Sequence, residues 1–292
     1  MNKKIRMPNF EFESATYQYK KNHQMAIETG IEDEVNSHIH FVFVLSQSYP
    51  LEYGSKLLGF PNFSMTEAYE EVRNGYQLVK FGFFKNAFKS LRSTFEMGIL
   101  SSYWAVIGNE ESSYMDWLKA ITDTPFFGKI IKPKLMGYQN IMKFNALFPI
   151  DELFKPVSDL HNFVHTKGLK HSTFNQIVKS NEKVISSWVN YMKLVIKGIT
   201  TLHLLKFPMA SIHYDYLKKF GTYSNTPLSG GLFGNYQDYL INLLGEEELK
   251  AIQKIAHEDP NVIEHLNWLD SLPDLSEDEI RNIKNEEQNK WS

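Results

Sequence analysis

Residues 64–107 read SMTEAYEEVRNGYQLVKFGFFKNAFKSLRSTFEMGILSSYWAVI, and this stretch decides the fold. Its apolar residues recur every three or four positions, at Val72, Tyr76, Val79, Phe83, Ala87, Leu91, Phe95 and Ile99. This is the period of an α-helix with one buried face. Ser64 and Glu67 have the spacing of a capping box, so a helix is expected to begin at Ser64. The pattern predicts one long helix, or two helices broken near Gly82.

Similar patterns continue along the chain and predict helices over residues 156–167, 174–206, 238–256 and 261–269. Pro156 suits the first turn of its helix, Gly168 suits the C-terminal stop, and Pro208 ends the longest helix. Residues 38–45 are so uniformly apolar that they fit a buried strand or a buried helix. Residues 276–292 are charged and fit a peripheral helix or a frayed tail. The sequence therefore predicts an all-α protein, a helical bundle with long central helices and an acidic helical C-terminal region.

Three regions are expected along the chain. Residues 1–63 form an N-terminal segment of uncertain structure that packs on the bundle. Residues 64–220 form the bundle itself. Residues 221–292 form a linker and the acidic helical region, because residues 221–231 combine glycine, serine, asparagine and proline at the point where the charge changes sign.

Composition excludes several classes of protein. The chain has 292 residues, 42% of them hydrophobic and 22% charged, enough for a real core. It has no cysteine, which excludes disulfides, thiolate nucleophiles and Cys-based metal sites and fits a reducing cytoplasm. Acidic residues follow the basic first residues at the positions where a signal peptide would be apolar, which argues against a secretion signal. Lysines interrupt the apolar tract 191–207, which argues against a membrane-spanning helix. We therefore expect a soluble cytoplasmic protein with no membrane partner.

The net charge of −3 hides an uneven distribution. Residues 222–292 hold 14 Asp and Glu against 5 Lys and Arg, whereas residues 129–219 hold 14 Lys and Arg against 5 Asp and Glu. A basic central block with an acidic C-terminal block fits nucleic-acid contact by the first and shielding by the second. Two solvated faces of different composition would give the same numbers.

An acid and a base interrupt an apolar row of the long helical stretch. The row, at steps of four residues, is Phe84, Phe88, Arg92, Glu96 and Leu100. A charge on such a face must be paired, and Arg before Glu is the less favourable order for an exposed helical pair. We therefore expect Arg92 and Glu96 to be largely buried and paired. The pair would either anchor a neighbouring segment or belong to a functional site.

His161 and His165 lie one helical turn apart, a spacing that allows two imidazoles to share a metal. No glutamate follows His161, so the HExxH motif of metalloproteases is absent, and we expect no metal. His165 can cap its helix, form hydrogen bonds in the core, or act in chemistry. Residues 230–234 lack the spacing and lysine of a phosphate-binding loop, and the chain has no GxSxG elbow.

Two motifs carry a resemblance to a known family. Ala87, Arg92 and Glu96 have the arrangement Ala-x4-Arg-x3-Glu, and residues 160–165 follow with Leu-x3-Val-His. Over roughly residues 64–205 the chain resembles the HEPN-like helical proteins of bacteria, which occur as uncharacterised or defence-associated proteins. The resemblance implies a helical bundle and, in many members, a homodimer.

Catalytic members of that superfamily are metal-independent ribonucleases with an Arg, a polar residue, three variable residues and a His. His165 matches the His and His161 the polar position, but Leu160 stands where the Arg should be. The resemblance therefore implies a degenerate motif. Catalysis would require Arg92 to supply the missing positive charge from another helix.

The leading hypothesis is a HEPN-like domain that engages RNA or a nucleotide in a bacterial stress or phage-defence setting, with weak metal-independent ribonuclease activity. Its candidate catalytic residues are Arg92, Glu96, His161 and His165, with no cofactor. The alternative is a non-enzymatic module that binds a protein partner, in which these four residues are structural. A small-molecule enzyme of another type comes third.

Overall fold

The computed structural model describes residues 10–50, 62–107, 111–165, 181–222, 226, 230–232 and 234–291. The protein is all-α: these residues form helices and connecting turns, with no β-strand among them. The helices are α1 (Phe10–Glu28), α2 (Ile31–Gln47), α4 (Asn62–Lys80), α5 (Phe84–Ile107), α6 (Glu111–Leu118), η1 (Phe127–Ile131), α7 (Lys132–Met136), α8 (Gln139–Asn145), α9 (Asp151–Val164), α11 (Asn181–Lys206), η3 (Pro208–Ser211), α12 (Leu217–Phe220), α13 (Gln237–Leu244), α14 (Glu246–His257), α15 (Pro260–Ser271) and α16 (Glu277–Trp291).

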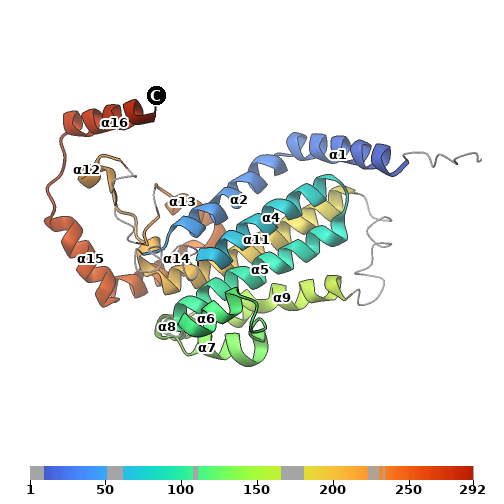
Figure 1. The fold of residues 1–292 in the computed structure, drawn as a ribbon, viewed down its shortest axis with the longest axis horizontal. Coiled ribbons are helices and arrows are strands. Elements are labelled where there is room, and N and C mark those ends of the chain that lie inside the picture. The colour runs from blue at the N-terminus through green and yellow to red at the C-terminus, as the bar shows by residue number, and fades with distance from the viewer. Residues whose placement is uncertain are drawn as a thin grey trace, which may run out of the picture.

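The core is a bundle of long helices in which α5 is central. It packs against α4, α11 and α9, while α2 covers α4 (Figure 1). Trp188 of α11 is fully buried, stacks on Tyr76 of α4, and donates its indole N–H to the carbonyl of Ala87 in α5, at 3.0 Å. This one side chain therefore joins three helices. In the described part of the chain no helix is both long and apolar enough to cross a membrane.

The stretch that decides the fold forms two helices, and the break lies at Gly82 as expected. Gly82 has φ of 79°, and its N–H donates to the carbonyl of Val79 while the N–H of Phe83 donates to that of Leu78. These two bonds form a Schellman motif, which a residue in the left-handed conformation closes. The predicted capping box is wrong, because α4 already includes Asn62 and Ser64 is buried inside the helix.

Other predicted boundaries differ from the structure. Helix α9 begins at Asp151, five residues before Pro156, because Asp151 and Glu152 suit the positive end of the helix dipole. The predicted stop at Gly168 lies outside the described residues. The predicted helix 238–256 is two helices, since Gly245 has φ of 98° between α13 and α14. The ambiguous residues 38–45 are helical, within α2.

Part of the acidic C-terminal region packs on the bundle. Helices α13 and α14 contribute Leu240, Leu244 and Ile252 to the main core, and α15 forms a small second core with Met209 and Tyr216. Helix α16 is peripheral (Figure 1). Among the described residues, three ion pairs join the basic block to the acidic one: Lys143 with Glu258, Lys197 with Glu248, and Lys219 with Asp274. The acidic region therefore neutralises lysines of α8, α11 and α12.

Candidate functional site

Helices α5 and α9 bring the predicted site residues together. Phe88 of α5 stacks on Phe163 of α9, with ring centroids 4.2 Å apart and planes within 8° of parallel. Leu160, three residues before Phe163 on α9, is fully buried. Residues at this spacing share a helix face, so this packing fixes the rotation of α9, and His161 beside that face contacts Arg92 of α5. The site thus joins two segments that are 69 residues apart in sequence.

Arg92 is the hub of the cluster. Its Nε and Nη2 donate to Glu96 Oε1 at 3.0 and 2.7 Å, and its Nη1 donates to His161 Nδ1 at 2.7 Å. A guanidinium can only donate hydrogen bonds, so Nδ1 of His161 must accept and the neutral ring carries its proton on Nε2. Protonation of His161 at Nδ1 would break this bond.

His165 lies at the C-terminal end of α9, where its backbone N–H donates to the carbonyl of His161. The imidazole rings of His161 and His165 are 4.2 Å apart between centroids. The side chain of His165 is exposed, so the position in the core considered for it from the sequence is wrong, whereas its place at the C-cap of α9 agrees with the capping alternative. In the described residues, no three His, Asp or Glu side chains gather as a metal site would require.

The expectation that Arg92 and Glu96 are largely buried is wrong for the carboxylate. The side chain of Arg92 is 18% exposed and that of Glu96 is 43% exposed. Phe88 and Leu100, which flank the pair in the same row, are both buried, so the exposure is confined to the charged pair. The pair is therefore a partly solvated one that lies beside the core.

This exposure changes the expected cost of removing Arg92. Since Glu96 remains solvated when its partner is lost, we expect Arg92→Ala to lower the free energy of unfolding by about 1 kcal/mol, rather than the ~3 kcal/mol of a stranded buried charge. Urea denaturation measures the difference. Arg73→Ala is the matched control, since Arg73 forms an exposed pair with Glu70 on α4. A loss of ~3 kcal/mol for Arg92→Ala alone would contradict a solvated pair.

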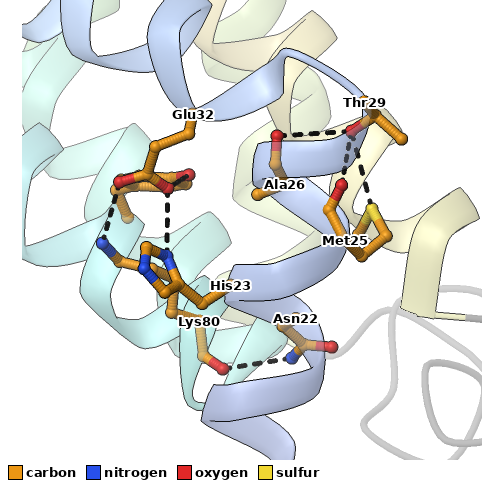
Figure 2. A network of polar contacts seen from close by, with 8 residues as sticks. Asn22, His23, Met25, Ala26, Thr29, Glu32 and Lys80 are labelled. Atoms are coloured by element: carbon orange, nitrogen blue, oxygen red, sulfur yellow. Dashed lines mark hydrogen bonds and ion pairs between the residues drawn. The ribbon is translucent and has the colours of Figure 1, made fainter.

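The sequence reasoning missed a second polar cluster, between α1, α2 and α4. Glu32 accepts a hydrogen bond from the hydroxyl of Tyr76 at 2.5 Å, and its other oxygen lies 3.4 Å from Nζ of Lys80. His23 Nδ1 lies 3.4 Å from the same carboxylate, and Asn22 donates to the carbonyl of Lys80 (Figure 2). Lys80 follows Tyr76 by four residues, so the sequence pattern already indicated that Lys80 lies on the buried face of its helix.

Comparison of the chain with protein-family models, with curated proteins and with solved structures found no match. The HEPN-like assignment therefore stays a prediction that rests on the motifs of the sequence. The geometry of Arg92, Glu96, His161 and His165 is independent of that assignment.

Proposed function

We propose that the chain is a cytoplasmic HEPN-like domain that engages RNA or a nucleotide through Arg92, His161 and His165, with weak metal-independent ribonuclease activity, in a bacterial stress or phage-defence setting. The observation that carries this proposal is the direct contact between Arg92 and His161, next to the exposed His165. Dimerisation belongs to the same proposal, because it rests on the same resemblance.

The remaining hydrogen-bond donors of Arg92 suit a phosphodiester. Arginine has five N–H groups, and the three bonds to Glu96 and His161 leave two of them free for phosphate oxygens. Lys89 and Lys85 lie one and two turns before Arg92 on the same side of α5, where positive charge favours a nucleic-acid backbone.

The chemistry of such a site would be acid–base transfer at the RNA 2′-hydroxyl. The exposed imidazole of His165 would accept that proton as the 2′-oxygen attacks phosphorus, and the P–O5′ bond would break as the leaving 5′-oxygen takes up a proton from water. Arg92 would stabilise the negative charge on the phosphorane. Leu160 is fully buried at the position of the motif arginine, so Arg92 would be the source of this charge. The hydrogen bonds from Arg92 to Glu96 and His161 restrict the movement of its guanidinium group. We therefore expect slow cleavage of RNA.

The hydrogen bonds of Arg92 within the protein also support the alternative, a non-enzymatic module that binds a protein partner. Three donors of Arg92 are already used within the protein, and the bond to His161 links α5 to α9. In this alternative the cluster orients α9 and contacts no substrate.

An RNA-binding experiment separates the two functions. We expect the full chain to bind fluorescent single-stranded RNA at low salt and to lose affinity steeply as salt rises, since bound counterions are released. Arg92→Ala should weaken binding about tenfold, the effect of losing one charged hydrogen bond. Arg73→Ala removes the same charge from α4 and should bind like the wild type. If the wild type does not bind RNA at low salt, the RNA proposal is wrong.

Cleavage is tested separately with total RNA in EDTA. The proposal expects slow formation of 2′,3′-cyclic phosphate ends, which His165→Ala abolishes while the thermal midpoint stays the same. Binding without any cleavage would reduce the proposal to RNA recognition. Robust cleavage that His165→Ala leaves unchanged would place the chemistry elsewhere in the molecule.

A further inference from the structure

A cleft of about 370 Å³ lies between α2, α11 and α13, apart from the Arg92 cluster. Helix α2 contributes Glu34 and His38, α11 contributes Lys193, and α13 contributes Tyr239 and Leu243. A volume of this size is at the lower end of the range of small-molecule sites. Three helices of the bundle thus supply ionic, polar and apolar groups to one opening.

One wall of the cleft is rigid and uncharged. His38 Nδ1 and the hydroxyl oxygen of Tyr239 are hydrogen-bonded at 2.6 Å, and the Tyr239 ring packs on buried Phe41 with centroids 4.3 Å apart. Burial lowers the pKa of His38, although Glu34 opposes this shift and Lys193 adds to it. Burial raises the pKa of Tyr239 far above its ordinary value. Both side chains are therefore neutral near pH 7.

The charges of the cleft are an exposed ion pair. Lys193 contacts the carboxylate of Glu34, and their side chains remain 41% and 39% exposed. A pair this exposed contributes little to stability, so either partner can exchange its contact for a ligand at low cost. With His38 neutral, the cleft presents one positive and one negative charge side by side.

We propose that this cleft binds a small zwitterion, an α-amino acid with an apolar side chain. Its carboxylate would contact Lys193, its ammonium group Glu34, and its side chain Leu243 and the ring of Tyr239. An anion placed on Lys193 would also face Glu34, and a cation placed on Glu34 would face Lys193, so each would meet a like charge. A ligand that carries both charges on neighbouring atoms matches both groups, and this site is independent of RNA binding at Arg92.

A matched set of ligands tests the charge requirement by calorimetric titration of the full chain. L-Leucine carries both groups, 4-methylpentanoate lacks only the ammonium group, and 3-methylbutan-1-amine lacks only the carboxylate. We expect L-leucine to bind and each analogue to bind about tenfold more weakly or not at all, because each loses one charge-assisted contact. No binding of L-leucine at millimolar concentration, or equal binding of either analogue, would overturn the proposal.

Variants then locate the binding. Lys193→Met and Glu34→Gln should each weaken L-leucine binding about tenfold. Lys183→Met is the control, since Lys183 is exposed in the first turn of the same helix, away from the cleft. Both substituted side chains of the ion pair are well exposed, so the variants should fold, and their thermal midpoints verify this. Wild-type affinity in either variant would place the leucine elsewhere and contradict the proposal.

Discussion

Glu32→Ala should lower the free energy of unfolding by about 3 kcal/mol, because it strands a buried charge. The substitution leaves the ammonium group of Lys80 without its carboxylate partner, and the Lys80 side chain is only 8% exposed. The ring of Tyr76, whose centroid lies 4.6 Å from that nitrogen, compensates only partly. Urea denaturation at pH 7 measures the loss.

Two further variants separate a stranded charge from a simple loss of packing. Asp33→Ala removes an exposed carboxylate from the same turn of α2 and should cost less than ~1 kcal/mol. Glu32→Ala combined with Lys80→Met removes both charges, so it should be more stable than Glu32→Ala alone. A double variant that is as unstable as the sum of both single variants would show that the charge of Lys80 is not the cause.

The same cluster predicts how stability depends on pH. Burial would raise the pKa of Glu32, but the hydrogen bond from Tyr76 and the charge of Lys80 outweigh it, so the pKa lies below its ordinary value of 4.5. The unfolded chain then binds the proton more readily than the folded protein. The contribution of Glu32 is therefore fully present above about pH 4.5 and is lost as the pH falls through the folded pKa. The difference in stability between wild type and Glu32→Gln should shrink on acidification.

Sequence patterns predicted the parts of the fold that local chemistry decides. The period of three to four residues and Gly82 were enough for α4, α5 and the break between them, because each depends on neighbours within one or two turns. Residues 38–45 stayed ambiguous because the stretch is apolar on all sides, and even the face that α2 turns to the solvent carries Phe43, which is 42% exposed. Asp151 and Glu152 were the signal for the true start of α9, and Pro156 obscured it.

The candidate site was accessible to sequence reasoning only in part. The row on α5 and the spacing on α9 identified all four residues of the cluster, but no local pattern could show that His161, rather than His165, bonds to Arg92. That contact depends on how Phe163 stacks on Phe88, which is tertiary packing. The cleft at His38 and Tyr239 joins side chains 201 residues apart and has no local signature.

Gly98→Ala should destabilise the protein by about 2 kcal/mol, although the same change stabilises most helices by up to about 1 kcal/mol. Gly98 lies inside α5 where it crosses α11, and an added Cβ would lie 2.3 Å from Cγ2 and 2.9 Å from Cβ of Ile199. No rotamer of Ile199 removes the second contact, since its Cβ is fixed by the backbone of α11. The two helices would therefore have to separate, at a cost in core packing.

Two comparisons test this close approach. Gly128→Ala is the control, because an added Cβ there meets its nearest neighbour at 3.8 Å, and it should not lower the thermal midpoint. Ile199→Ala alone should cost ~2–5 kcal/mol through the cavity it leaves. When the two substitutions are combined, Ile199→Ala removes the Cγ2 atom that an alanine at position 98 would meet. The loss of unfolding free energy in the double variant should therefore be at least about 1 kcal/mol smaller than the sum of the losses in the two single variants. Additive losses would mean that Gly98 does not set the distance between α5 and α11.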